Sequence, residues 1–273
     1  MLLAAWKPSK REISSMQTAP LHAKPVPPAS PLLAGSNPAQ ALLLTENAAL
    51  TNGPPLLFQR LTAKEREEVL REGQKRVVYR GKMLFSQGTP HDGIFLIESG
   101  RIRVFYIAPS GREITLAYWS AGNFVGGPEL FGQGQHVWSG VAATNSVVVH
   151  LTGKTLRRLI AQIPGFAIGL IEGLTFKGKC YSALAQMLGT RSVTERLAHL
   201  LIHLADTYGV KEEGAIAIGS AFTHADLAHM VGATRQWVTI SLKRLQEQGV
   251  LKAEKAKIVV YDLDALHVMR GDR

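Results

Sequence analysis

Cysteine is almost absent from this chain, and long uninterrupted apolar runs are missing as well. Among 273 residues only Cys180 is a cysteine, so neither an internal disulfide nor a four-cysteine iron–sulfur cluster can form. No stretch approaches the roughly eighteen consecutive apolar residues that a membrane-spanning helix needs. The start, MLLAAWKPSKREISS, lacks the apolar core and cleavage site of a secretory signal. These absences predict a cytoplasmic protein with no membrane partner.

Positive charge is missing from one stretch, although the chain as a whole carries a net charge of +10. No Lys or Arg occurs from Glu113 to Gly153, so this stretch cannot supply the cationic side chains that bind phosphates most strongly. Residues 191–273 are nearly neutral, with 11 Lys and Arg against 10 Asp and Glu. Six of those basic residues nevertheless lie between Ala233 and Lys257. This local cluster, more than the overall charge, favours a nucleic-acid partner.

The segment from Thr223 to Tyr261 has the spacing of a helix-turn-helix followed by a short β-hairpin. Thr223 and Asp226 form a capping pair that starts the first helix. Gly232 follows where the chain must turn sharply, a position that favours a residue without a Cβ. Thr234 can cap the second helix, and Gly249 ends it. The segment therefore predicts a winged helix-turn-helix that binds double-stranded DNA.

The second helix of this motif has one buried stripe and one outward face. The stripe consists of Val238, Leu242 and Leu245. We predict that seven residues contact DNA. They are the caps Thr223 and Thr234, the outward residues Arg235, Gln236, Thr239 and Lys243 of the second helix, and Lys257 of the hairpin. Arg pairs bidentately with guanine and Gln with adenine, while Ile240 can contact a thymine methyl. The hairpin lysines Lys252, Lys255 and Lys257 suit phosphate contacts.

The remainder of the chain divides into three parts of different character. Residues 1–55 are rich in Pro and Ala and predict a flexible tail. Residues 56–163 contain short apolar runs separated by glycine turns, most clearly between Lys75 and Leu151. Such strands predict an antiparallel barrel or jelly roll (β-roll). Residues 191–273 form the DNA-binding domain, so the predicted fold class is α+β.

Residues 164–190 predict one long helix with heptad spacing, followed by a hinge. Leu174, Tyr181 and Leu188 recur every seven residues, and Leu170 and Leu184 bracket Lys177 in a second row. This pattern is typical of a coiled-coil seam, which favours a symmetric homodimer built on these five apolar residues. The alternative, a single helix lying on its own barrel, stays open. Ser192 and Glu195 form a capping box that starts the next helix.

The order of barrel, long helix, hinge and winged helix-turn-helix resembles the Crp/Fnr family of bacterial transcription regulators over roughly residues 60–262. The motifs that carry the resemblance are GIFLIESGRIRVF with PSGREITL, AGNFVGGPELF, SVTERLAHLL and GATRQWVTISLKRLQEQGVL. The resemblance implies a homodimer that reads a palindromic operator and either recruits or blocks RNA polymerase. It also implies that the barrel senses a small molecule or a redox signal.

Departures from the family pattern concern both the barrel and the reading helix. Gly127, Val137 and Trp138 stand where cyclic AMP-binding members carry Glu, Arg and Ser. The usual cyclic AMP contacts are therefore missing, and the effector has no predicted identity. The resemblance places further effector contacts at Tyr181 and Ser182, and backbone amides after Gly126 and Gly127 can hold a weak anion. In the reading helix, Gln236 and Ile240 replace the family's Glu and Arg, which predicts a different operator.

Other functions are compatible with parts of this pattern. A DNA-binding regulator that needs no effector stays open. A cupin-like metal enzyme is disfavoured because residues 75–152 contain no clustered His and Glu. A haem sensor would need an axial ligand such as His91, His136 or His150, and Cys180 would be the residue of a redox sensor. We predict no catalytic residue, no metal ligand and no cofactor.

Overall fold

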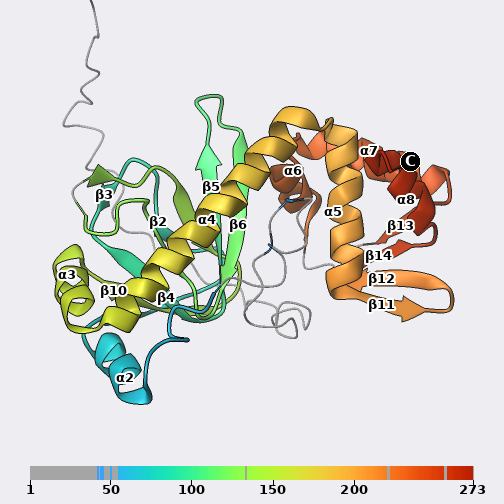
Figure 1. Cartoon of the computed structure of the whole chain (residues 1–273). Coiled ribbons are helices and arrows are strands. Elements are labelled where there is room, and N and C mark those ends of the chain that lie inside the picture. Colours follow the sequence, from blue (N-terminus) through green and yellow to red (C-terminus); the bar gives the residue numbers. More distant parts are fainter. Residues whose placement is uncertain are drawn as a thin grey trace, which may run out of the picture.

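A strand-rich barrel and a mixed C-terminal domain lie at opposite ends of one long helix, α4 (Figure 1). The computed structural model describes residues 42, 44–45, 50, 55–132, 134–219, 222–254 and 257–272. Within these residues, no helix is both long and apolar enough to cross a membrane. The arrangement confirms the predicted fold class of a β-roll, a long helix and a winged helix-turn-helix.

The barrel consists of two four-stranded antiparallel sheets and one short strand pair. One sheet has the order β1-β10-β4-β7, the other β2-β9-β5-β6, and β3 pairs with β8. The strands are β1 (Gln74–Val78), β2 (Met83–Phe85), β3 (Pro90–His91), β4 (Ile94–Ser99), β5 (Arg101–Ile107), β6 (Glu113–Ser120), β7 (Phe124–Gly126), β8 (Gly134–Gln135), β9 (Ser139–Ala142) and β10 (Ser146–Leu151). Every pairing is antiparallel, as expected for a jelly roll.

Within the part of the chain that the structure describes, three helices flank the barrel. Helix α2 (Ala63–Arg71) begins at a capping box made by Thr62 and Glu65. Helix α3 (Gly153–Gln162) leads into α4 (Pro164–Thr190), which starts with a proline at its first position and runs for 27 residues. Because α4 packs along the barrel, its inner side is buried in the single chain, and its outer side is exposed.

The C-terminal domain contains the predicted helix-turn-helix and a larger sheet than the predicted hairpin. Its helices are α5 (Val193–Tyr208), α6 (His224–Val231), α7 (Arg235–Glu247) and α8 (Leu263–Arg270). Its sheet has the order β11-β12-β14-β13, with β11 (Gly209–Glu212), β12 (Ala215–Gly219), β13 (Leu251–Glu254) and β14 (Lys257–Val260). The wing therefore consists of the last two strands, and the sheet gains two further strands that sequence patterning had not indicated.

Part of the segment predicted to be a flexible tail is buried between the two domains. Leu42 is 1% exposed and pairs through its backbone with Tyr118 of β6. The carbonyl of Thr45 accepts a hydrogen bond from His199 of α5, and Leu50 joins an apolar cluster of the barrel and α4. The tail prediction is wrong at these positions, because a high Pro content elsewhere in residues 1–55 does not prevent single leucines from filling the core.

Replacing Leu42 by alanine is expected to lower the free energy of unfolding by about 2–4 kcal/mol, because the substitution leaves a cavity in a packed core. The same change at Leu56, which is 38% exposed, serves as the matched control and should cost about 1 kcal/mol or less. Urea denaturation of both variants measures the difference. Equal, small losses for the two would show that Leu42 contributes no packing.

Candidate DNA-binding interface and effector region

The helix-turn-helix is held by two N-terminal caps and a left-handed glycine. Thr223 accepts a hydrogen bond from the amide of Asp226, whose carboxylate accepts one from the amide of Thr223 in return. Gly232 ends α6 with φ of 67°, a conformation that residues with a Cβ adopt only with strain. The Thr234 hydroxyl accepts from the amide of Trp237 and starts α7. Each local feature predicted for this motif is present in the structure.

The outward face of α7 is exposed and its inner stripe is buried. Val238, Leu242 and Leu245 are at most 6% exposed and join the core of the C-terminal domain. The side chains of Arg235, Gln236, Thr239 and Lys243 are exposed on the other side. Within the described parts of the chain, no side-chain hydrogen bond or ion pair engages Arg235 or Gln236. These two side chains are therefore available to a ligand at the N-terminal end of α7.

The other predicted DNA contacts have partners within the chain. The Thr239 hydroxyl donates to the carbonyl of Arg235 at 2.9 Å and lies 2.9 Å from Nδ1 of His224. Lys243 pairs with Glu247 at 3.6 Å on the same helix, and Lys257 with Glu212 of β11 at 2.5 Å. Such exposed ion pairs are weak, so a phosphate can replace the carboxylate partner. Lys255 lies outside the described residues.

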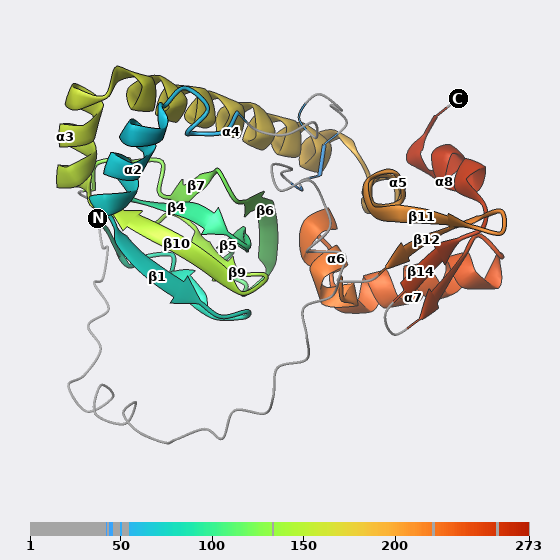
Figure 2. The same cartoon turned by 90° about the horizontal axis from the view of Figure 1, so that it is seen from below.

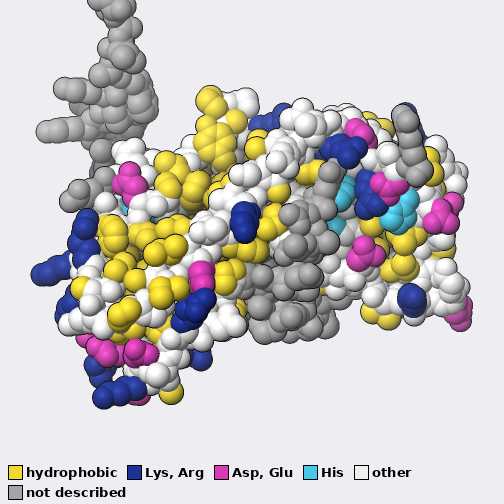
Figure 3. Space-filling model, in the orientation of Figure 1, with side chains coloured by type: hydrophobic (Ala, Val, Ile, Leu, Met, Phe, Trp, Pro, Cys, Tyr) yellow, Lys and Arg dark blue, Asp and Glu magenta, His cyan; other side chains and the backbone are white. Residues whose placement is uncertain are grey.

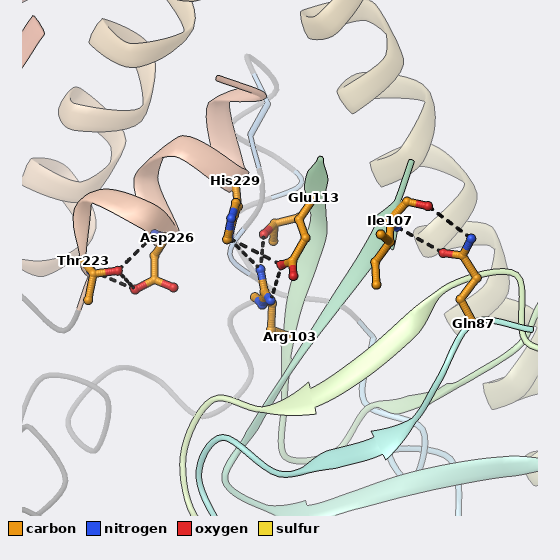
Figure 4. Close-up of polar contacts among 8 residues, drawn as sticks. Gln87, Arg103, Ile107, Glu113, Thr223, Asp226 and His229 are labelled. Atoms are coloured by element: carbon orange, nitrogen blue, oxygen red, sulfur yellow. Dashed lines mark hydrogen bonds and ion pairs between the residues drawn. The ribbon is translucent and has the colours of Figure 1, made fainter. Parts of the chain in front are cut away.

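The helix-turn-helix also contacts the barrel directly (Figure 4). Arg103 of β5 donates to Glu113 of β6 at 2.7 Å, and His229 of α6 lies 3.1 Å from Arg103. Burial lowers the pKa of His229, with Glu113 acting in the opposite direction. Arg112, in the turn between β5 and β6, donates to the carbonyl of Gly232. Both views place α6 beside β6 (Figures 1 and 2), so the barrel can bias the position of the reading helix.

Arg196 connects the segment after α4 to the turn that follows α6. Arg196 of α5 is 7% exposed. Its guanidinium donates to the carbonyl of Val231 at 2.8 Å, at the end of α6, and to the carbonyl of Arg191 at 2.8 Å, just beyond α4. Burial lowers the pKa of Arg196, although a guanidinium remains charged. One side chain therefore connects the end of α4 to the end of α6.

The heptad residues of α4 do not lie where an intermolecular seam requires. Leu170 is 1% exposed and Leu184 is 3% exposed within the single chain, so the prediction of a dimer contact is wrong for these two. Leu174, Tyr181 and Leu188 are partly buried on the inner side, and their place in a dimer stays a prediction. A row of apolar residues shows that one face of a helix is buried, but it does not show which part of the molecule buries it. In this chain the barrel and α5 cover that face of α4.

A different row of α4 residues, the outer stripe, is exposed and follows the same heptad spacing. It consists of Pro164, Ile168, Ile171, Thr175, Gly178, Ser182, Ala185 and Gly189. Ile168 and Ile171 are 45% and 62% exposed, and on this face of the molecule hydrophobic side chains gather along the barrel end of the helix (Figure 3). A cleft of about 600 Å³ runs beside the other end of the stripe, with Gly178 and Ser182 in its lining.

The six predicted effector contacts divide into an inner and an outer group. The indole of Trp138 donates to the carbonyl of Gly126 at 2.6 Å and its ring lies 5.5 Å from that of Tyr181. Val137 is 47% exposed, and Ser182 is exposed on the outer stripe. The amide of Gly127 donates to Nε2 of His91 at 2.8 Å. The proposal that this amide holds an anion is therefore wrong.

His91 and His136 of the barrel and the thiol of Cys180 on α4 are buried, whereas His150 is partly buried. Burial lowers the pKa of His136 to about 4, and it also lowers that of His91, whose ring packs against His136 at 4.7 Å. Burial raises the pKa of Cys180 to about 12, against the opposing effect of Lys177, so the reactive thiolate is disfavoured. Among the described residues no group of three or more His, Cys, Asp or Glu side chains is placed to hold a metal ion.

Lys177 is a residue whose role sequence analysis missed. Its ammonium nitrogen is buried and donates a hydrogen bond to none of the described residues. The nitrogen lies 3.2 Å from the ring centroid of Trp119 and 5.0 Å from that of Phe124. Burial lowers the pKa of Lys177 to about 7. Its position midway between Leu170 and Leu184 in the heptad row could have indicated that it faces inward.

Comparisons with known proteins agree with this architecture. Residues 75–163 match the family model for a cyclic nucleotide-binding domain, and residues 195–269 match that for a Crp-like helix-turn-helix domain. The CRP-like cAMP-activated global transcriptional regulator of Mycobacterium tuberculosis is 28% identical over 188 residues, which cover 68% of this chain and 84% of the relative. The cyclic AMP receptor protein of Thermus thermophilus is 28% identical over 202 residues, covering 73% and 89%.

Solved structures show the same fold. The c-di-GMP responsive global regulator CLP of Xanthomonas campestris gives a TM-score of 0.67 at 21% identity, covering 73% of this chain and 99% of that one. The barrel, the long helix and the winged helix-turn-helix together define a DNA-binding transcription regulator with a cyclic-nucleotide-binding-like domain. The chain belongs to the Crp/Fnr family, whose regulators bind DNA as dimers.

Proposed function

We propose that two copies of this chain read a palindromic operator chiefly through Arg235 and Gln236. The observation that carries this proposal is the exposed, unengaged pair of side chains in the first turn of α7. The Thr234 cap and the buried stripe fix the rotation of α7, so these two side chains project outward together. Arg235 pairs with guanine and Gln236 with adenine in the major groove. The caps Thr223 and Thr234 and the side chains of Thr239, Lys243 and Lys257 position the domain on the phosphates.

The two copies pair through the outer stripe of α4. Ile168 and Ile171 are exposed apolar side chains on a long helix, and a self-complementary contact would bury both copies of each. Gly178 supports the same interface. An added Cβ at this position meets nothing within 4 Å, although glycine inside a helix costs about 1 kcal/mol relative to alanine. Close approach of a second helix gives a reason for its presence.

The barrel acts as a sensor that does not use the usual cyclic AMP contacts. Gly127, Val137 and Trp138 occupy the positions of those contacts, and Gly127 and Trp138 are engaged within the barrel itself. Contacts of Arg103 and Arg112 with α6 and the Gly232 turn provide a route from the barrel to the DNA-binding domain. The regulator acts in the cytoplasm, where its DNA lies, and contacts RNA polymerase there.

Replacing Arg235 by alanine is expected to weaken operator binding by about 1–3 kcal/mol per half-site, because a bidentate contact to one base is lost. Binding to random DNA of equal length should change much less. Fluorescence anisotropy at fixed salt concentration, on an operator isolated by selection from random sequence, measures both affinities. Equal losses on the operator and on random DNA would refute the base-reading role.

Lys257→Ala is the matched control for a phosphate contact. It should weaken operator and random DNA alike and reduce the magnitude of the salt dependence by about one charge. The Lys257 side chain is paired with Glu212 in the absence of DNA, so the loss should be smaller than for a lysine that starts unpaired. A base-specific loss for Lys257→Ala would place the wing in the base-reading role instead.

A further inference from the structure

The most anomalous polar group in the described part of the chain is the ammonium of Lys177. It is buried among aromatic side chains, Trp119 and Phe124, and no carboxylate or carbonyl of the described residues accepts its protons. Burying an unpaired cation is costly, and the cation–π contact with Trp119 offsets only part of that cost. Methionine would fill the same space without this penalty. Among the described residues nothing pairs with this ammonium, so it is open to a partner from outside them.

The location of Lys177 connects this group to the effector region. It projects from α4 into the apolar cluster that contains Trp119, Phe176 and Cys180, which Trp138 and Tyr181 flank. No Lys or Arg occurs from Glu113 to Gly153. In the described residues of that stretch the barrel thus offers aromatic walls without positive charge, and α4 supplies the cation.

We propose that the effector of this regulator is a small aromatic carboxylic acid whose carboxylate pairs with the ammonium of Lys177. A single cation in an apolar enclosure suits one negative charge, because a second charge would stay unpaired. The rings of Trp119, Phe124 and Phe176 suit a flat apolar body. This inference rests on the proposed sensor function of the barrel and names the class of compound that it binds.

Access to Lys177 involves the segment that precedes the barrel. Leu50 is 6% exposed and belongs to the same apolar cluster as Trp119 and Cys180. It also lines the cleft beside α4, together with Thr45. Thr45 in turn is bound to His199 of the DNA-binding domain through its carbonyl. A ligand that displaces Leu50 would therefore disturb a contact of α5, which links binding at Lys177 to the position of the reading helix.

The test compares phenylacetate with its neutral isostere phenylacetamide by isothermal titration calorimetry on the full-length protein. Wild type should bind phenylacetate at least about tenfold more tightly, because the neutral phenylacetamide leaves the buried ammonium without a counter-charge. In Lys177→Met the preference should fall below about twofold. Lys179→Met, which alters an exposed lysine of the same helix, should keep it. A wild-type protein that binds phenylacetate no better than phenylacetamide would overturn the proposal.

Proton uptake provides a readout that needs no variant. The pKa of Lys177 is about 7, so at pH 8 the amine is mostly neutral and must take up close to one proton when it pairs with a carboxylate. Titrations in buffers of different ionisation enthalpy measure this number. Binding of phenylacetate without proton uptake would contradict the role of Lys177, even if the affinity were high.

The same samples separate this inference from the proposed function. Operator affinity is measured for wild type and for both lysine variants without phenylacetate. Normal operator binding with no preference for phenylacetate would refute only the effector class. Failure of the folded wild-type protein to distinguish operator from random DNA would refute the proposed regulator function, whatever phenylacetate does.

Discussion

Replacing Ile171 by glutamate is expected to convert the homodimer into monomers and to reduce operator affinity by about a hundredfold or more. Ile171 is 62% exposed in the single chain and belongs to the apolar, barrel-end part of the outer stripe. A glutamate there would bring two like charges together across a two-fold axis, with no opposite charge to pair them. Each monomer would then read one half-site, without the second set of contacts. Sedimentation velocity and anisotropy on the same preparation measure both effects.

The control for this variant is Val77→Glu. Val77 lies on β1 and is 61% exposed. Val77→Glu therefore also replaces an exposed apolar side chain by a carboxylate, but at a position outside α4. This protein should stay dimeric and bind the operator normally. If Ile171→Glu also stays dimeric and binds normally, the outer stripe is not the interface, and the partly buried Leu174, Tyr181 and Leu188 become the first alternatives to examine.

Replacing Lys177 by methionine is expected to stabilise the protein at pH 7 by about 2 kcal/mol or more, because a buried group that prefers to be charged is removed. The effect should depend on pH. Burial lowers the pKa of Lys177 from 10.5 to about 7 in the folded chain. Between these two values the unfolded chain binds one more proton than the folded chain, so wild-type stability rises with pH by up to about 1.4 kcal/mol per unit.

The variant lacks this contribution, so its advantage over wild type should shrink steadily from pH 7 to pH 10. Urea denaturation at each pH measures the difference in the free energy of unfolding. Lys179→Met, whose lysine is exposed on the same helix, should run parallel to wild type throughout. Parallel curves for Lys177→Met and wild type would show that the amine titrates normally and is not buried in solution.

Local signals made the reading helix predictable from sequence. The capping pair Thr223 and Asp226, the left-handed Gly232 and the cap Thr234 each act within a few residues. Once they fix where α6 and α7 begin, the spacing of the apolar residues decides which side of α7 faces outward. Arg235 and Gln236 could therefore be assigned to the exposed side without knowledge of the rest of the fold.

Contacts between distant segments could not be predicted in the same way. The apolar heptad row of α4 is covered by the barrel and α5, and periodicity does not distinguish this from a second copy of the chain. Leu42 packs against Tyr118 although it lies in a segment of low complexity. Strand β11 has the sequence GVKE and is largely exposed, so it lacks the alternation that marks a half-buried strand.

The contact between the barrel and the helix-turn-helix was also beyond sequence reasoning. Arg103 and Glu113 lie on the neighbouring strands β5 and β6, but His229 is remote from both in sequence and meets them only in the folded chain (Figure 4). The same holds for Arg112 and the turn at Gly232. These contacts are made by polar residues that belong to no sequence motif. The barrel and the helix-turn-helix could therefore each be predicted from the sequence, but the contacts between them could not.

The stoichiometry and symmetry of the complex with DNA test the central claim most directly. Native mass spectrometry of the protein with an operator isolated by selection should show two protomers on one duplex. The selected sequences should contain two inverted half-sites whose centres lie about one helical turn, or 10 base pairs, apart. A complex with a single protomer, or selected sequences without two-fold symmetry, would contradict the account.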